Sequence, residues 1–167
     1  MTKFAPNVGR EVNSMTGRLT VFILALGLSL TAEASSGSRI QKQEHHCLSL
    51  ALYWEARGEP EKGRLAVGWT ILNRERSPEF PSSVCGVVFE GGETPPCQFS
   101  WWCDGKSDRP RDKKSWIRSQ VLAARLLTDP PPDPTRGALF FHSTSIAVPW
   151  VRPRTRTARI GNHIFYR

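Results

Sequence analysis

Apolar residues recur at helical spacing along much of the chain. Over residues 44–57, the pattern places four residues on one face of a helix: Leu48, Ala51, Leu52 and Glu55. Gly58 ends this helix, and Pro60 can open the next one. Three of these four residues are apolar, so the face should point into the protein core.

Two longer helices are expected further along, over residues 60–76 and 113–128. Each carries apolar residues at helical spacing: Leu65, Trp69 and Leu72 in the first, and Trp116, Ile117, Val121, Ala124 and Leu127 in the second. A short helix over residues 82–90 is expected between them, and residues 97–110 are rich in turn formers.

The pattern changes after the prolines of residues 130–134. Ala138–Phe141 and Arg159–Tyr166 predict short strands or extended segments, and Gly161-Asn162 interrupts the second. No internal repeat is visible. The predicted fold class is therefore α+β, dominated by helices, in a single domain with short β segments toward the C-terminus.

The N-terminal part reads as a targeting segment. Residues 19–30 are apolar and uncharged but too short for a comfortable membrane span, and Ala32-Glu33-Ala34 has the small residues that a signal peptidase requires. We expect a secretory signal over residues 1–34, with Met15 as an alternative start, and an exported, periplasmic or envelope-associated protein. The rest divides into a short flexible segment, 35–43, and one folded domain, 44–167, which would carry any activity. An uncleaved anchor, the only expected membrane contact, remains open.

Charge narrows the choice of partners only in part. Lys and Arg number 23 against 15 Asp and Glu, which gives a net charge of +8 that favours nucleic acid, an anionic membrane or an acidic wall polymer. The C-terminal part holds a basic run: Arg152, Arg154, Arg156 and Arg159. Nucleic-acid binding conflicts with export and ranks last, so we expect no nucleic-acid partner. Oligomeric state is open, with a monomer as the default.

Four cysteines suggest two disulfides in an exported protein, and three pairings are possible. We favour Cys97 with Cys103 and Cys47 with Cys85. A zinc site is the rival interpretation, but no C-x-x-C pair is present, so no metal and no cofactor is expected. A nucleophilic Cys47–His dyad is conceivable, although oxidation of the thiols would disable it.

Glu55 is the first candidate for catalysis. A carboxyl on the apolar side of a helix loses hydration, and the negative end of the helix dipole acts in the same direction, so its pKa should be raised. A carboxyl that is protonated near neutral pH can act as a general acid. A surface glutamate paired with Arg57 is the alternative.

A second carboxylate does not stand out. Glu59, Asp104 and Asp108 are possible partners. Gly58 is expected to turn Glu59 away, which favours a solvated residue before Pro60, and Asp104-Gly105 is an ordinary turn.

Amide, hydroxyl and aromatic groups gather between Cys97 and Cys103, a mixture typical of small-molecule clefts. Candidate substrate contacts are Gln98, Phe99, Ser100 and Trp101, to which His142, Trp150 and Tyr166 could add. His45, His46 and His163 are weaker candidates.

Four motifs occur in a suggestive order: Glu55-Ala56-Arg57-Gly58-Glu59, Leu72-Asn73-Arg74, Cys97-Gln98-Phe99-Ser100-Trp101 and Ile160-Gly161-Asn162-His163-Ile164-Phe165-Tyr166. From Cys47 to Arg167 the chain resembles the spore-cortex-lytic-enzyme family of cell wall hydrolases. The resemblance implies a lysozyme-like domain, related to lytic transglycosylases, that acts on peptidoglycan glycan strands. It assigns the catalytic acid and base to Glu55. Two departures from the best-known members are the lack of an upstream peptidoglycan-binding repeat in this sequence and a cysteine set that suits a periplasmic protein. Because relatives in the family also occur in bacteria that make no spores, a role in germination is not expected.

The expected reaction is cleavage between N-acetylmuramic acid and N-acetylglucosamine with 1,6-anhydro ends. Attack by the sugar itself would explain why no second carboxylate is conspicuous. A muramidase that uses water is one alternative, and a wall-binding protein without catalysis is another.

Overall fold

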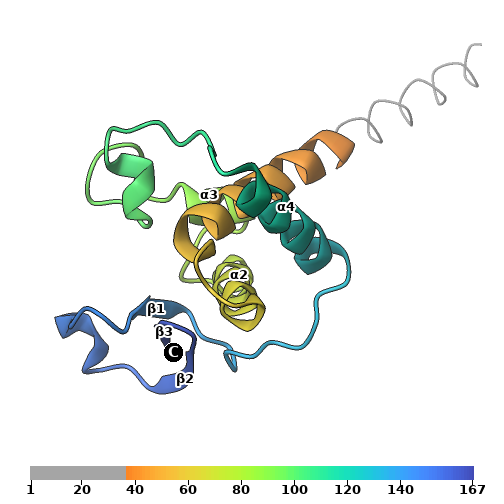
Figure 1. Cartoon of the computed structure of the whole chain (residues 1–167). Coiled ribbons are helices and arrows are strands. Elements are labelled where there is room, and N and C mark those ends of the chain that lie inside the picture. Colours follow the sequence, from red (N-terminus) through yellow and green to blue (C-terminus); the bar gives the residue numbers. More distant parts are fainter. Residues whose placement is uncertain (1–36) are drawn as a thin grey trace, which may run out of the picture. The chain divides into compact units, whose positions relative to one another are not determined.

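The computed structural model describes residues 37–167, in which helices are followed by a small antiparallel sheet (Figure 1). A helix over residues 37–56, here called the leading helix, comes first. The later elements are α2 (Glu61–Glu75), α3 (Val84–Val88), the 3-10 turn η1 (Ser100–Cys103), α4 (Lys113–Thr128), β1 (Phe140–Ser143), the 3-10 turn η2 (Pro149–Val151), β2 (Arg156–Ile160) and β3 (His163–Tyr166). The predicted helix-dominated α+β class is confirmed.

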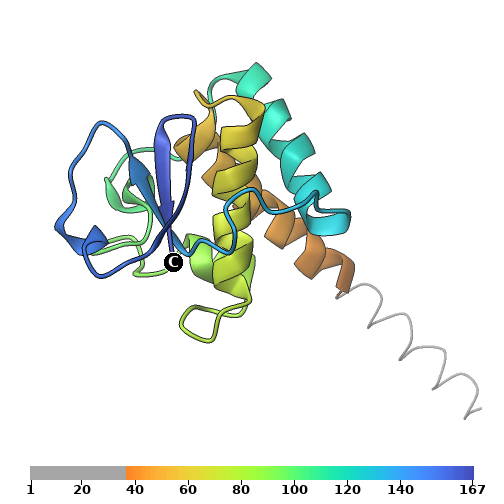
Figure 2. The ribbon, with the colours of Figure 1, turned by 90° about the horizontal axis from the view of Figure 1, so that it is seen from below.

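Helix α2 is the central element of the fold. It contacts α3, α4, β1 and β2, and Figure 2 shows it between the sheet and the other long helices. One apolar cluster joins the leading helix to α2, α3 and α4, while a second joins α2 to the sheet through Val67 and Phe165. Small residues such as Gly63, Ala66 and Gly68 let α2 be buried on several sides.

The three strands pair in the order β1-β3-β2, all antiparallel. The extended segment expected over 159–166 is therefore two strands, because Gly161 takes a positive φ of 58° and reverses the chain. Strand β2 also starts earlier than expected, at Arg156, inside the basic run.

The leading helix extends further toward the N-terminus than the expected 44–57. Residues 37–43, expected to be part of a flexible segment, are helical and exposed. They include good helix formers such as Arg39, Gln41 and Lys42 but bury nothing, so they have no apolar period to detect. The predicted signal over 1–34 lies outside the described residues. Within 37–167, no helix is both long and apolar enough to cross a membrane.

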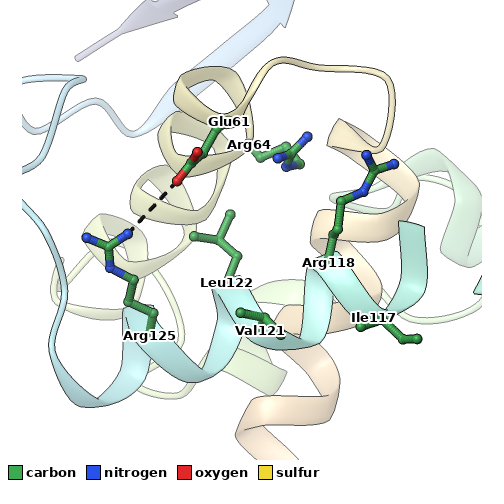
Figure 3. A pocket seen from close by; sticks show the side chains of 7 residues that line it. All are labelled: Glu61, Arg64, Ile117, Arg118, Val121, Leu122 and Arg125. Carbon is green, nitrogen blue, oxygen red and sulfur yellow. Dashed lines mark ion pairs between the residues drawn. The ribbon is translucent and has the colours of Figure 1, made fainter. Parts of the chain in front are cut away.

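Helix α4 has the predicted bounds but not the predicted buried face. It buries Ser115, Ser119, Leu122, Ala123 and Leu126. Two residues of the expected apolar stripe, Ile117 and Val121, are 48% and 65% exposed instead. With α2 they form a shallow groove of about 230 Å³ with a basic rim (Figure 3); its lining is Glu61, Arg64, Ile117, Arg118, Val121, Leu122 and Arg125.

Two disulfides link Cys47 to Cys85 and Cys97 to Cys103, the pairing that we favoured from the sequence. The first ties the leading helix to α3. The second closes a loop around Gln98–Trp102, which positions the aromatic segment between the two sulfurs. Because Cys47 is oxidised, the alternative Cys47–His nucleophile is wrong.

Candidate active site

A cavity of about 500 Å³ opens where the end of the leading helix, α2, the Cys97–Ser100 loop and the sheet meet. Its lining combines one carboxyl with several aromatic and polar side chains: Glu55, Arg74, Cys97, Gln98, Phe99, Ser100, Phe141, His142, Ser143, Ile146, Val148 and His163. A few polar groups on a largely preformed wall are typical of sites for small molecules and sugars.

Glu55 lies in the last turn of the leading helix and is half-buried. Burial raises the pKa of its carboxyl to about 7, while the Trp101 indole and the positive charge of Arg74 oppose the rise. The Trp101 Nε1 faces the carboxyl outside ordinary hydrogen-bond geometry and has no other partner among the described residues. Arg57, considered as an ion-pair partner from the sequence, lies over the rings of Tyr53 and Trp54 instead. A large fraction of Glu55 is therefore protonated near neutral pH, which a general acid requires.

Arg74 is the main feature of the site that the sequence did not indicate as functional. Its side chain is 3% exposed. The Nε donates to the Leu139 carbonyl at 2.6 Å, and both terminal nitrogens donate to the Gln98 amide oxygen at 3.0 and 3.2 Å once that amide is oriented correctly. Burial lowers its pKa to about 10, while the negative charges of Glu90 and Glu55 raise it. Arg74 thus remains charged and stabilises ionised Glu55.

The spacing of α2 carried a signal for Arg74. Val67, Ile71 and Arg74 fall at i, i+4 and i+7, and all three are buried. An arginine in register with an apolar stripe indicates a buried cation, which requires partners.

The aromatic segment divides between two walls. Gln98, Phe99 and Ser100 line the cavity with Glu55. The ring of Trp101 lines a neighbouring cavity, where it stacks on Trp54 at 6.4 Å, while its Nε1 faces Glu55. All four candidate contacts therefore lie close to Glu55, but only three share its cavity.

His142 lines the cavity, and its Nε2 lies 3.1 Å from the hydroxyl of Tyr166. The two rings stack at 5.5 Å, so Tyr166 supports His142 from behind. Trp150 falls in η2, and its side chain is not among those that the structure describes. His163, considered weak from the sequence, lines the cavity from β3.

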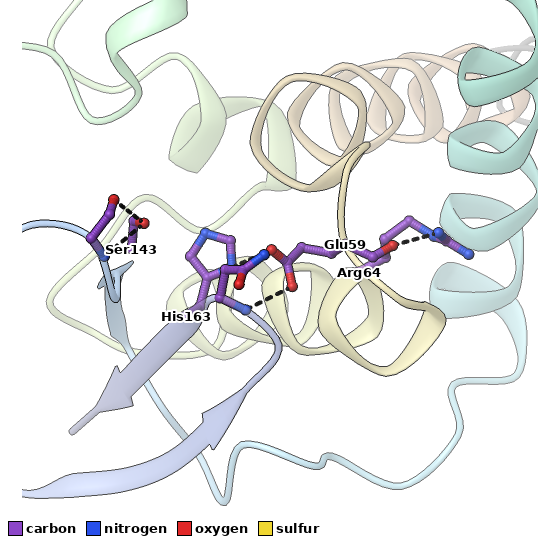
Figure 4. A network of polar contacts seen from close by, with 6 residues as sticks. Glu59, Arg64, Ser143 and His163 are labelled. Atoms are coloured by element: carbon purple, nitrogen blue, oxygen red, sulfur yellow. Dashed lines mark hydrogen bonds and ion pairs between the residues drawn. The ribbon is translucent and has the colours of Figure 1, made fainter.

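The expectation that Glu59 is solvated is wrong: the residue is 7% exposed. Its Oε2 accepts a hydrogen bond from the backbone N–H of Asn162 at 3.0 Å, and its Oε1 lies 3.6 Å from His163 Nδ1 (Figure 4). Burial lowers the pKa of His163, which the charge of Glu59 opposes. Gly58 turns Glu59 away from the helix face as expected, but toward the β2–β3 turn rather than the solvent. Glu59 thus joins the turn before α2 to a strand that forms the cavity wall.

Asp104 and Asp108 line the neighbouring cavity with Trp101 and do not line the one that contains Glu55. Among the described residues that line the Glu55 cavity, Glu55 is the single carboxyl. The site therefore offers one acid, with no second carboxylate on its wall. Within residues 37–167, no three His, Cys, Asp or Glu side chains are grouped as metal ligands would be.

Gly161→Ala tests the link between Glu59 and the hairpin. A Cβ at position 161 would overlap the Glu59 carboxylate, and the alanine would also have to keep the positive φ of Gly161. We expect the free energy of unfolding to fall by about 2–4 kcal/mol, since the left-handed conformation costs roughly 1–2 kcal/mol and displacement of a buried carboxylate adds to it. The measurement is urea denaturation.

Gly92→Ala is the matched control, because Gly92 also has a positive φ, of 76°, but open space around its Cβ position. Its free energy of unfolding should fall by only about 1 kcal/mol, the cost of the left-handed backbone conformation alone. Equal losses in the two variants would show that the Glu59 contact contributes nothing.

Comparison with known proteins places these features in a family. Residues 58–166 match the family described as Cell Wall Hydrolase, and the chain belongs to this family. The matched range begins just after Glu55, so it covers most of the cavity wall but not the candidate acid.

Relatives and solved structures agree with this assignment. The chain is 40% identical over 119 residues to the spore cortex-lytic enzyme of Bacillus subtilis, covering 71% of this chain and 35% of the relative. It is 39% identical to the spore cortex-lytic enzyme of Halalkalibacterium halodurans, covering 71% of this chain and 33% of that relative. The chain thus spans about a third of the length of these curated relatives.

Two catalytic domains of known structure are similar over most of their length. The domain of the Bacillus cereus SleB protein gives a TM-score of 0.58 at 31% identity, covering 75% of this chain and 91% of that one. The catalytic domain of the germination-specific lytic transglycosylase SleB from Bacillus anthracis gives a TM-score of 0.58 at 31% identity, covering 74% of this chain and 93% of that one.

Proposed function

We propose that this protein is an exported enzyme that cleaves the glycan strands of peptidoglycan between N-acetylmuramic acid and N-acetylglucosamine, as a lytic transglycosylase. The main support for this proposal is the cavity described above. Among its lining residues Glu55 carries the single carboxyl, and its pKa is raised to about 7. The similarity to a SleB lytic transglycosylase domain supports the same reaction. Two disulfides support a location outside the reducing cytoplasm.

In the proposed reaction, protonated Glu55 gives its proton to the glycosidic oxygen as the bond from that oxygen to the anomeric carbon breaks. The resulting carboxylate, stabilised by the charge of Arg74, then takes the proton of the muramoyl 6-hydroxyl. The 6-oxygen bonds to the anomeric carbon and closes a 1,6-anhydro ring. Glu55 ends protonated, as it began. The substrate supplies its own nucleophile, so the second carboxylate that most glycosidases use as a nucleophile or to activate water is not needed.

The main alternative is a muramidase in which a water molecule attacks. Such an enzyme needs a second carboxylate to activate the water. Glu59 is engaged by Asn162, whereas Asp104 and Asp108 line the adjacent cavity and are the candidates for that role.

The products distinguish the two reactions. We expect mass spectrometry of wall sacculi digested with the purified protein to show disaccharide peptides one water lighter than the hydrated products, with 1,6-anhydromuramic ends. Products at the full hydrated mass would show that the protein is a muramidase and not a lytic transglycosylase. Absence of any released glycan would favour the third possibility, a wall-binding protein without catalysis.

A further inference from the structure

A second cavity, of about 380 Å³, lies next to the Glu55 cavity. Its lining is Tyr53, Trp54, Arg57, Trp101, Asp104, Lys106, Ser107, Asp108 and Arg111. At two places consecutive residues divide between the cavities: Trp54 lines the second and Glu55 the first, while Trp101 lines the second and Ser100 the first. The two cavities therefore adjoin each other at these residues.

Tyr53 fixes the Arg57 side chain and the Arg111 backbone on one wall of the second cavity. Its side chain is 1% exposed, and its hydroxyl accepts a hydrogen bond from Arg57 Nη1 at 3.3 Å. The same oxygen accepts the backbone N–H groups of Arg111 at 3.1 Å and Asp112 at 3.0 Å. The Arg57 guanidinium also lies over the rings of Tyr53 and Trp54, at 5.2 and 5.3 Å from their centroids. Arg57 is thus held in place before any ligand arrives.

The remaining charges of this cavity are of both signs. Lys106 pairs with Asp104 at 3.4 Å, and both are solvent-exposed. Asp108 is more buried, and burial together with the charges of Asp104 and Glu93 raises the pKa of its carboxyl. The Trp54 indole donates to the Asp108 carbonyl at 3.3 Å, which fixes this loop against the leading helix. Two arginines and one partly buried aspartate therefore face a space beside the candidate acid.

Such a wall is more highly charged than recognition of neutral sugars requires. N-acetylglucosamine carries no charge, and the lactyl group of N-acetylmuramic acid is neutral once a peptide is attached. The attached stem peptide, in contrast, carries several carboxylates and an amine. Arginine binds carboxylates with paired, planar hydrogen bonds, and an aspartate can accept from an ammonium group.

We propose that the second cavity binds the stem peptide of a muramoyl residue next to the scissile bond, so that the protein prefers peptide-bearing over denuded glycan. This inference rests on the proposed function. Arg57 and Arg111 bind the stem carboxylates, and Trp54 and Trp101 cover the apolar part of the stem.

The test compares two soluble substrates with one glycan: uncrosslinked strands that keep their stem peptides, and the same strands stripped by an amidase. For the purified protein we expect kcat/KM to be about tenfold higher on the peptide-bearing strands, as one or two charge-assisted hydrogen bonds would provide. Arg57→Gln with Arg111→Gln should remove this preference, mainly through KM. Arg111→Gln alone, which keeps its backbone bond to Tyr53, should remove part of it even if the double variant folds poorly.

The matched control is Arg118→Gln with Arg125→Gln, which removes the same charge from the groove of Figure 3. It should keep the preference of the parent, which excludes a general effect of net charge. Equal cleavage of both substrates by the parent, or a preference unchanged in Arg57→Gln with Arg111→Gln, would overturn this inference alone. Cleavage of neither substrate would overturn the proposed function, and this inference with it.

Discussion

The Glu55→Gln protein is expected to lose about a thousandfold or more of its lytic rate, since general acid–base catalysis contributes roughly 10²–10⁴. Glutamine keeps the shape of the side chain but cannot donate the proton that the leaving oxygen needs. The measurement is the rate at which the purified protein releases fragments from sacculi. Glu79→Gln, an exposed change of the same kind, is the control and should retain the parent rate. A Glu55→Gln protein as active as its parent would show that Glu55 takes no part in catalysis.

The same variant should become more stable, which separates lost chemistry from lost folding. Glu55 binds its proton more tightly in the folded protein than in the unfolded chain, because its pKa is raised to about 7. The native carboxyl therefore costs stability as pH rises from the ordinary glutamate pKa of about 4.3 to about 7, and the full cost remains above that. Urea denaturation should show Glu55→Gln more stable than the parent by about 2–3 kcal/mol near pH 8, with little difference near pH 4.

Replacement of Arg74 should have the largest effect on stability. Arg74→Met keeps the apolar stem but removes the donors to Leu139 and Gln98, and it leaves Glu90 without its neighbouring cation. One Glu90 carboxylate oxygen is already buried without a hydrogen bond. We expect the free energy of unfolding to fall by about 3–5 kcal/mol, as when one partner of a buried charge pair is removed.

Two further variants qualify that result. Arg74→Lys restores the charge without the planar fork and should recover less than half of the loss. Arg76→Met, on the exposed end of the same helix region, loses a contact over the Trp69 ring at 5.3 Å and should cost only about 0.5–1 kcal/mol. An Arg74→Met protein as stable as Arg76→Met would show that the buried cation is dispensable.

The sequence predicted the parts of the fold that depend on local periodicity. Helix α4 has the predicted bounds, and α2 lies within one residue of them at each end, since proline and apolar spacing mark both. Glu55 was found because its burial follows from the leading helix alone. It shares a face with Leu48 and Leu52, which are fully buried.

The rest of the site depends on partners that are distant in the chain. Arg74 is bound by a carbonyl 65 residues away, and Glu59 by a backbone N–H 103 residues away. Glu59 was predicted to be solvated because nothing near it in the sequence indicates its distant partner. Arg74 received no role, although its register with Val67 and Ile71 on α2 indicates that it is buried. The prediction of which face of α4 is buried was also wrong. Its serines pack inward, while Ile117 and Val121 stay exposed.

The Glu59–Asn162 bond also bears on when activity can appear as the chain folds. Strand β3 supplies His163 to the cavity wall, while Glu59 follows the helix that carries Glu55. A fragment that ends before β3 contains the candidate acid but cannot complete its cavity. Contacts so far apart form late, because the entropy of closing a long loop must be overcome first. The proposed lytic activity would therefore arise only after nearly all of the domain has been synthesised and folded.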